Sequence, residues 1–234
     1  MASIVLVGGS CLGAWAWERV TPTLASAGHD VHPLTLTGFG DRAHLLTAQT
    51  DLTMHATDIV AAIEMADLHD VVLVAHSYAG APATVAASFI PERIKRIVYV
   101  AALLPEGGKT LFEVSPEGFE EIISGYLLED GLRIAVINDY ILDNFYGQHG
   151  LDDAGRAWLR ARSFGQPIAT YRDRAPDDLS AVEALPRTYL KCSGDPGDPT
   201  LPVGIERIEL DSGHWPMITA PDALAAMVGF QADR

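Results

Sequence analysis

A serine, a histidine and two aspartates occupy positions where they could form one nucleophilic catalytic unit. Ser77 follows the apolar segment 71–75 and precedes a run of small residues. His214 lies near the end of the chain, and Asp195 and Asp198 lie between the two. A serine hydroxyl is a weak nucleophile at neutral pH, so it needs a base, and the base needs an acid to orient it. This order of residues predicts acyl transfer through a serine.

The surroundings of Ser77 are typical of a nucleophile elbow, in which a tight turn between a strand and a helix lifts the serine hydroxyl above a sheet. The residues two before and two after the serine must be small, because the helix passes close to the strand. Here they are Ala75 and Ala79, where glycines are usual. We therefore predict Ser77 as the nucleophile.

The base and the acid are expected in loops that follow late strands. His214 lies in the loop 211–216 before the last predicted helix, from which an imidazole can reach back over the sheet. Asp195 and Asp198 both follow the predicted strand that ends at Cys192. One of the two is expected to orient the imidazole of His214 and the other to be a turn residue.

The glycine-rich loop 7–13 is expected to complete an oxyanion hole. We predict that the backbone N–H of Ser10, in this loop, and that of Tyr78, directly after the nucleophile, donate to the oxyanion. A dinucleotide site is disfavoured, because the loop is not G-x-G-x-x-G and the second predicted strand ends without an acidic residue. The histidines show no metal-ligand spacing, so we expect no metal and no cofactor.

Short apolar segments alternate with helical patterns along most of the chain. We predict strands at 4–7, 31–36, 71–75, 97–101, 187–192 and 205–210 and helices at 15–27, 52–66, 78–90 and 221–230. Such alternation predicts an α/β fold with a doubly wound, mostly parallel sheet. Residues 105–180 break the pattern, with predicted helices at 119–128, 132–145 and 153–163 and no convincing strand. We interpret 1–104 and 181–234 as a hydrolase core and 105–180 as a helical cap of the same domain, over the carboxyl ends of the strands.

Bulk properties limit the partners. The 234 residues suit one domain, and the formal net charge of −15 disfavours nucleic acid and anionic membranes. Cys11 and Cys192 are far apart in sequence and are expected to be reduced thiols. With no apolar span of about 20 residues and no signal-like N-terminus, we expect a cytoplasmic protein that does not enter a membrane.

Several motifs together resemble the plant methylesterase and hydroxynitrile lyase group of α/β-hydrolases and its bacterial relatives. The resembling segments are residues 8–17, similar to an H-G-x-x-x-G-A-W-x-W opening, 36–47, 71–80, 91–94 and 192–195, similar to a C-x-x-D acid segment. The resemblance implies an α/β-hydrolase fold with a small helical cap, no cofactor and often a homodimer. It also favours Asp195 over Asp198 as the acid.

The same resemblance separates esterases from lyases within the group. The lyases carry a threonine directly before the oxyanion-loop donor and a lysine directly after the catalytic histidine. Here these positions hold Gly9 and Trp215, so the esterase branch is favoured.

The leading hypothesis is a carboxylic ester hydrolase that cleaves a small, neutral ester, a methyl ester or lactone, through an acyl-serine. We predict that Gly9, Leu12, Trp215 and Tyr126 contribute to its substrate pocket. Two alternatives stay open. One is a non-hydrolytic reaction at the same site (C–C lyase, cyclase or acyl transfer), and the other is a small-molecule receptor without turnover.

Overall fold

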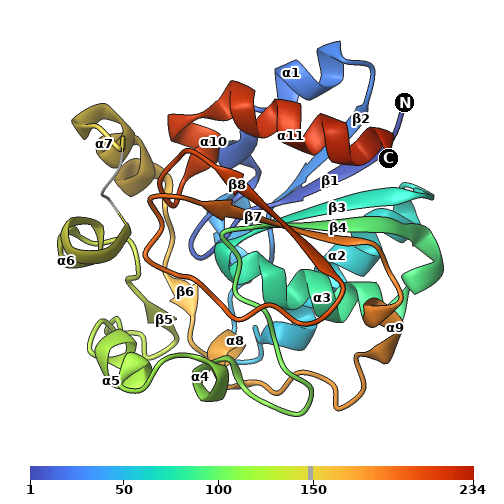
Figure 1. Cartoon of the computed structure of the whole chain (residues 1–234). Helices are drawn as coiled ribbons and strands as arrows, with labels where there is room; N and C mark the ends of the chain where they lie inside the picture. Colours follow the sequence, from blue (N-terminus) through green and yellow to red (C-terminus); the bar gives the residue numbers. More distant parts are fainter. Residues whose placement is uncertain (147–149) are drawn as a thin grey trace.

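A six-stranded parallel sheet forms the centre of the computed structural model, which describes residues 1–146 and 150–234. The strand order is β2-β1-β3-β4-β7-β8, and each neighbouring pair runs in parallel. The bounds are β1 Ser3–Val7, β2 Asp30–Leu34, β3 Val71–His76, β4 Ile94–Val100, β7 Arg187–Cys192 and β8 Ile205–Leu210. The predicted doubly wound sheet is confirmed (Figure 1).

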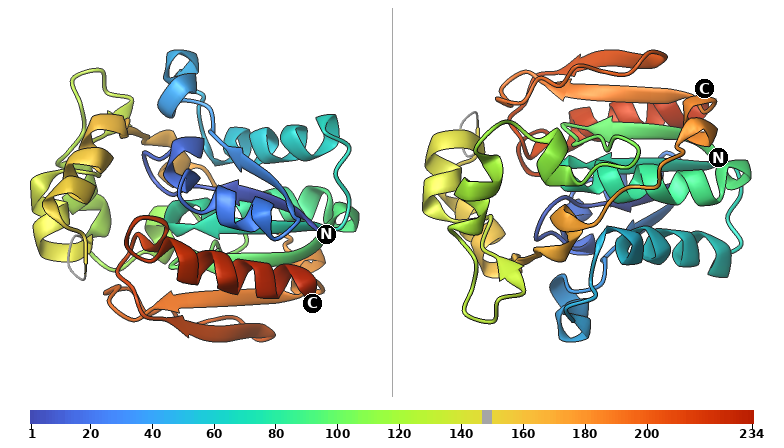
Figure 2. Two further views of the ribbon diagram at one scale, coloured as in Figure 1. Left: turned by 90° about the horizontal axis from the view of Figure 1, so that it is seen from above. Right: turned by 90° about the horizontal axis from the view of Figure 1, so that it is seen from below.

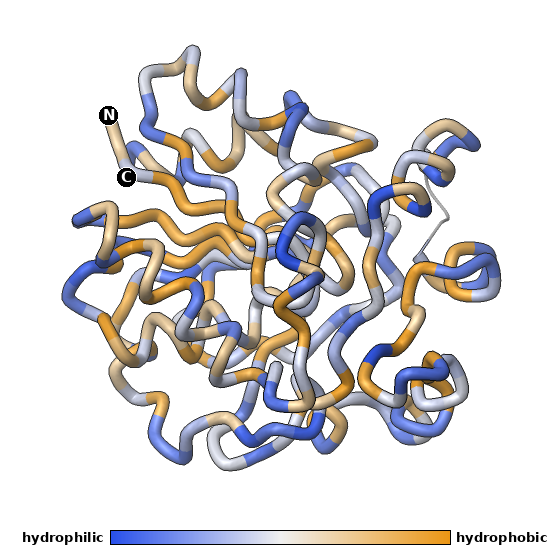
Figure 3. The backbone as a smooth tube through the Cα atoms, turned by 180° about the vertical axis from the view of Figure 1, so that it is seen from behind, coloured by the Kyte–Doolittle hydropathy of each residue, from blue (hydrophilic) through white to orange (hydrophobic). Residues whose placement is uncertain are grey.

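The central strands are buried on both faces. Every residue of β3 and of β7 is buried, whereas β2 and β8, at the edges of the sheet, are partly exposed. A strand covered on both faces has an apolar side chain at nearly every position, which is why 71–75 is uniformly apolar. Figure 3 shows apolar residues gathered along these strands and hydrophilic residues in the outer helices and loops.

Helices cover both faces of the sheet. Helices α1 (Thr21–Ser26) and α11 (Pro221–Asp233) pack together on one face, and α2 (Leu52–Met65), α3 (Gly80–Phe89) and α9 (Ser180–Glu183) lie on the other (Figure 1). The short helix α10 (Pro216–Thr219) leads into α11. Parallel strands joined by crossover helices produce this layering.

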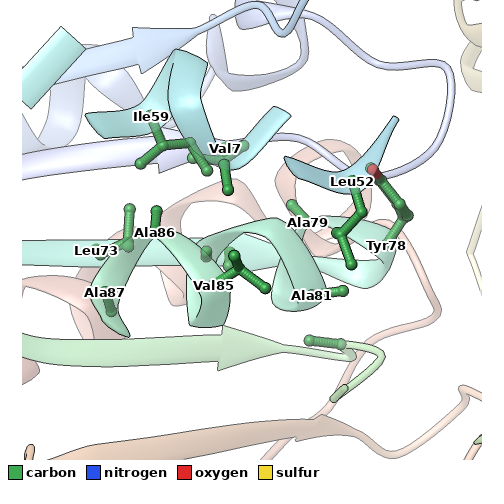
Figure 4. Close-up of a cluster of buried hydrophobic side chains, with 14 of the residues drawn as sticks. Val7, Leu52, Ile59, Leu73, Tyr78, Ala79, Ala81, Val85, Ala86 and Ala87 are labelled. Carbon is green, nitrogen blue, oxygen red and sulfur yellow. The ribbon is translucent and has the colours of Figure 1, made fainter. Parts of the chain in front are cut away.

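Helix α3, which follows the candidate nucleophile, contributes mostly small side chains to the core. Figure 4 shows Ala86 of α3 clustered with Val7 of β1, Ile59 of α2 and Leu73 of β3, all of which are fully or almost fully buried. Because alanines bring α3 close to the sheet, the start of this helix is held in a fixed position relative to the end of β3.

The predicted helix 15–27 is two separate elements. A 3-10 helix covers Ala14–Trp17, and α1 begins at Thr21 with Pro22 in its first turn. Proline has no N–H to donate to the preceding turn, so it fits the start of a helix and not its interior. The end is as predicted: Gly28 follows α1 with φ of 89°.

The cap covers one end of the sheet, away from the chain termini (Figure 2). Its helices are α4 (Leu111–Val114), α5 (Phe119–Ser124), α6 (Asp139–Ile141), a π-helix (Leu142–Tyr146), α7 (Asp153–Arg162) and α8 (Ala169–Arg172). The predicted helix 132–145 is wrong in its first half, where β5 (Arg133–Ile134) pairs antiparallel with β6 (Gln166–Pro167). Asn138 then begins a new helix, because its side chain accepts a hydrogen bond from the amide of Ile141.

Candidate active site

Ser77 occupies a strained turn between β3 and α3. Its φ is 53°, in the left-handed region that non-glycine residues rarely adopt, and residues Ser77–Ala79 form a 3-10 turn. Ala79 is completely buried. The position that does require glycine is Gly80, where a Cβ would lie 2.5 Å from the carbonyl oxygen of Leu103. The chain therefore forms an elbow despite the alanines at the usual glycine positions.

A continuous hydrogen-bond chain joins Ser77, His214 and Asp195. The Oγ of Ser77 lies 3.0 Å from Nε2 of His214, and Nδ1 of His214 contacts Oδ2 of Asp195. With Nδ1–H donating to the carboxylate, Nε2 is free to accept the serine proton. Asp198 is elsewhere: it is exposed and pairs with Arg207 at 2.6 Å. Of the two aspartates, Asp195 is the one that meets the imidazole.

The carboxyl of Asp195 is buried yet stabilised as a carboxylate. Burial opposes its ionisation, but the hydrogen bond and charge of His214, the amide of Gly197 at 2.6 Å and the charge of Lys191 outweigh burial and lower the pKa of Asp195 below its ordinary value. An ionised acid at this position favours the tautomer of His214 that protonates Nδ1.

Three residues around the Asp195–His214 pair are not indicated by the sequence pattern. His76 lies 2.7 Å through its Nε2 from the carbonyl oxygen of His214, to which it donates, and burial lowers the pKa of His76 to about 3. Tyr146, from the cap, lies over the imidazole with ring centroids 4.2 Å apart. The Nζ of Lys191 donates a hydrogen bond to the backbone carbonyl of Asp195. His76 could have been suspected from its place beside the nucleophile, whereas nothing in the sequence links Tyr146 to His214.

The two predicted oxyanion donors belong to segments whose side chains are anchored. The Oγ of Ser10 lies 3.1 Å from the hydroxyl of Tyr171 in α8. The hydroxyl of Tyr78 lies 2.9 Å from Nδ1 of His55, whose Nε2 donates to the carbonyl of Thr37 at 2.7 Å. These contacts fix both backbone segments beside Ser77, and the role of the two amides stays a prediction.

Gly9 brings the glycine-rich loop 7–13 into contact with Ser77. A Cβ at this position would lie 2.6 Å from Cβ of Ser77 and 2.9 Å from Nδ1 of His76. Since real side chains do not approach so closely, a substitution must push the loop away from Ser77.

We expect Gly9→Ala to lower kcat/KM for small esters by about 10²-fold or more, because one misplaced oxyanion donor costs about that much. Steady-state kinetics on the purified variant checks this. Gly229→Ala provides a control for adding a methyl elsewhere, since a Cβ at this position in α11 would make only ordinary contacts, 3.7 Å from Nε2 of His29 and 3.8 Å from Cδ2 of Leu24. A Gly9→Ala enzyme with unchanged kcat/KM would contradict the predicted placement of the loop.

The remaining predicted pocket residues have different surroundings. Trp215 is buried and meets the ring of His214 edge-on, with centroids 5.2 Å apart. Leu12 packs in the hydrophobic core, and Tyr126 lies against Tyr140 in the cap. Their roles as substrate contacts stay predictions. A cavity of about 240 Å³ borders the glycine-rich loop 7–13 at Cys11 and is lined otherwise by residues 128–165 of the cap.

Two buried neutral histidines predict a loss of stability in mild acid. Burial lowers the pKa of His55 to about 4 and that of His76 to about 3, from 6.5. Between these values and 6.5 the unfolded chain binds more protons, so the free energy of unfolding falls as the pH drops below 6.5.

From pH 7 to pH 5 we expect the free energy of unfolding to fall by about 2 to 4 kcal/mol, measured by urea denaturation at both pH values. The carboxylates with lowered pKa values remain ionised in this range and do not cause the change. Exposed His69→Gln should leave the difference unaltered. Equal stability at both pH values would contradict the neutral state of His55 and His76.

The described residues hold no group of three or more His, Cys, Asp or Glu side chains arranged to bind a metal ion. Over the same residues, no helix has both the length and the apolar character needed to cross a membrane.

Comparisons with known proteins agree with the fold. Residues 4–227 match the Alpha/beta hydrolase family. The chain is 30% identical to the carbendazim hydrolyzing esterase of Nocardioides sp. (strain SG-4G), over 96% of this chain and 97% of that one. It is 28% identical to methylesterase 9 of Arabidopsis thaliana, over 96% and 95% of the two chains. A solved extracellular alpha/beta-hydrolase from a Paenibacillus species superposes with a TM-score of 0.85 at 21% identity, covering 99% of each chain.

The chain belongs to the alpha/beta hydrolase family, and it is an enzyme of the carboxylic ester hydrolase class. The resemblance to the methylesterase group that the motifs indicated is confirmed, as is the fold that it implied.

Proposed function

We propose that this enzyme hydrolyses a small, uncharged carboxylic ester through an acyl intermediate on Ser77. The observation that carries the proposal is the chain of contacts from Ser77 through His214 to the buried carboxylate of Asp195. In this scheme Ser77 is the nucleophile, His214 the general base and then the general acid, and Asp195 the group that orients the imidazole.

The first half-reaction forms the acyl-enzyme. The Oγ of Ser77 attacks the ester carbonyl while Nε2 of His214 takes its proton, and the resulting imidazolium is stabilised by the carboxylate of Asp195. The amides of Ser10 and Tyr78 bind the oxyanion. The imidazolium then gives its proton to the departing alcohol, and the ester C–O bond breaks.

The second half-reaction repeats these steps with water. His214 removes a proton from water, the hydroxide attacks the acyl carbon, and the tetrahedral intermediate collapses with protonation of Ser77. The product acid gives up its proton to solvent and leaves as a carboxylate. A chain with a net charge of −15 repels this anion, which favours release of the product and entry of an uncharged ester.

The substrate class is supported by the site and by the relatives. Aromatic side chains meet at the histidine, with Tyr146 over its ring and Trp215 at its edge, and aromatic walls favour apolar, planar groups. The two curated relatives are named as a carbendazim hydrolyzing esterase and a methylesterase. Methyl esters of aromatic acids are therefore the first substrates to assay.

A lyase reaction is less well supported. A threonine at position 9, as in the lyases of the group, would place its Cβ 2.6 Å from Cβ of Ser77. Position 215 is a tryptophan, so the site lacks the lysine that the lyases carry after the catalytic histidine.

Hydrolysis in ¹⁸O-labelled water followed by mass spectrometry distinguishes the reactions. Hydrolysis through an acyl-serine must place one solvent oxygen in the product acid. A product without solvent oxygen would exclude hydrolysis and favour acyl transfer or cleavage of a C–C bond. Tight binding of the ester with no product at all would favour a receptor.

A further inference from the structure

A buried lysine lies beneath the turn that carries the acid. Lys191 belongs to β7, in which every residue is buried, and only 6% of its surface is exposed. Its Nζ donates to the carbonyl oxygen of Cys192 at 2.7 Å and to that of Asp195 at 2.6 Å. These carbonyls lie at the two ends of the turn 192–195, so one ammonium group bridges the two ends of the turn.

Burial of the Lys191 side chain costs free energy of desolvation, which indicates that the lysine has a role at this position. A lysine is rarely buried without a carboxylate partner, because desolvation of its charge disfavours burial. Here the ammonium is bonded to neutral carbonyls instead of a carboxylate. Its charge nevertheless acts on Asp195 and lowers the pKa of that carboxyl. The lysine thus combines a mechanical contact with the turn and an electrostatic effect on the acid.

We propose that Lys191 is a positioning residue of the catalytic unit, which holds the turn of Asp195 in place so that its carboxylate meets Nδ1 of His214. The inference rests on the proposed function, because it assigns Lys191 an effect on the Asp195–His214 pair. Asp195 is the only member of the pair that Lys191 contacts in the described residues, so its effect on catalysis passes through the acid.

Other titratable groups also face the Asp195–His214 pair. Their charges determine how the pair's affinity for a proton changes when Lys191 is replaced. The groups that are coupled electrostatically to Asp195 or His214, or that contact them, are His76 of β3, Tyr146 of the cap, and Tyr189 and Cys192 of β7. Asp198, in the following loop, acts on Tyr189 and pairs with Arg207. Burial keeps His76 neutral and raises the pKa values of Tyr146 and Cys192 to about 12. Besides His214, Lys191 is the group whose charge lowers the pKa of Asp195.

The sign of the effect follows from this. The ammonium stabilises the carboxylate of Asp195 and disfavours a proton on the pair. Without it, the pair binds a proton more readily, so the acidic limb of the pH profile of kcat/KM moves to higher pH. A nearby charge typically shifts such a limb by about one pH unit.

The test compares Lys191→Met with wild type from pH 5 to 9, with p-nitrophenyl acetate as the substrate. We expect kcat/KM on the plateau to fall by about 10-fold and the midpoint of the acidic limb to rise by about 0.5 to 1 pH unit. Lys191→Gln, which keeps a donor for one carbonyl, should preserve the fold if the methionine variant does not and should show the same upward shift, since it also lacks the charge.

Arg187 provides the matched control. It lies on the same strand, is buried to a similar extent and donates to the carbonyl of Val203 at 3.1 Å, but it lies at the opposite end of β7. We expect Arg187→Met to change the stability of the protein without moving the acidic limb. An unmoved limb in both Lys191 variants, or an equal movement in Arg187→Met, would overturn the inference.

A double variant separates this inference from the proposed function. In an Asp195→Asn background, Lys191→Met should lower kcat/KM by less than about twofold, because the group through which it acts is gone. A full 10-fold further loss would overturn the positioning role. If Ser77→Ala turned over the ester at the wild-type rate, the proposed function and this inference would both fail. Loss of activity in Ser77→Ala with no limb shift in Lys191→Met would overturn the inference alone.

Discussion

Ser77→Ala is expected to lower kcat for small esters by about 10⁴- to 10⁶-fold, and His214→Ala to lower it almost as much. The alanine removes the atom that attacks the ester, and the histidine variant leaves that atom without its base at 3.0 Å. Members of one catalytic unit act together, so the double variant should be only slightly slower than either single variant. Steady-state kinetics on a methyl ester of an aromatic acid measures all three.

Ser88→Ala is the control for the serine substitution. Ser88 lies in α3 and donates to the carbonyl of Val85, away from the hydrogen-bond chain, so its variant should keep wild-type kcat. If Ser77→Ala lost no more activity than Ser88→Ala, the ester would be cleaved elsewhere on the protein.

Asp195→Asn is expected to lower kcat by about 10⁴-fold, because an amide can donate to Nδ1 and so favour the tautomer of His214 in which Nε2 is protonated. That tautomer cannot accept the proton of Ser77. The change in size is small, so the loss would reflect the hydrogen bond and not the packing.

Asp198→Asn is the matched variant, since it makes the same chemical change three residues away. Asp198 is exposed and paired with Arg207, and exposed ion pairs contribute little. Its variant should keep kcat within about twofold of wild type. Comparable losses in the two variants, or a larger loss in Asp198→Asn, would show that the acid changes place when substrate binds.

The fold could be predicted from the sequence because its signals are strong and local. Segments such as 71–75 are apolar throughout, as strands in the centre of a parallel sheet must be. The cap lacks such a signal. Its strands β5 and β6 have two residues each, too few for an alternating pattern, so the region 132–145 was predicted as helix.

The candidate site was predictable to the extent that its residues occupy fixed places in the chain. Two of these residues have recognisable surroundings: Ser77 lies at a strand–helix turn, and His214 lies in the loop after the last strand. The structure places Oγ of Ser77 3.0 Å from Nε2 of His214. The choice between Asp195 and Asp198 depended on resemblance, because both follow the same strand. Their side chains take different partners only in three dimensions.

The residues that surround the hydrogen-bond chain could not be predicted. Tyr146 reaches His214 because the cap folds over the core, and no spacing in the sequence encodes that contact. Lys191 looks like an ordinary strand residue until its burial and its bonds to two carbonyls are known. The hydrogen bond from Tyr78 to His55 joins the turn after β3 to helix α2, two segments that the sequence pattern does not pair.

Labelling with a fluorophosphonate probe tests the central claim most directly, since the probe reacts with an activated serine whatever the natural substrate is. The account predicts one adduct, which peptide mass spectrometry locates on Ser77. The His214→Ala variant should not form this adduct. The Asp198→Asn variant, in which an exposed residue is changed, should be labelled like wild type. A folded protein that is not labelled, or that carries the adduct on another serine, would contradict the account.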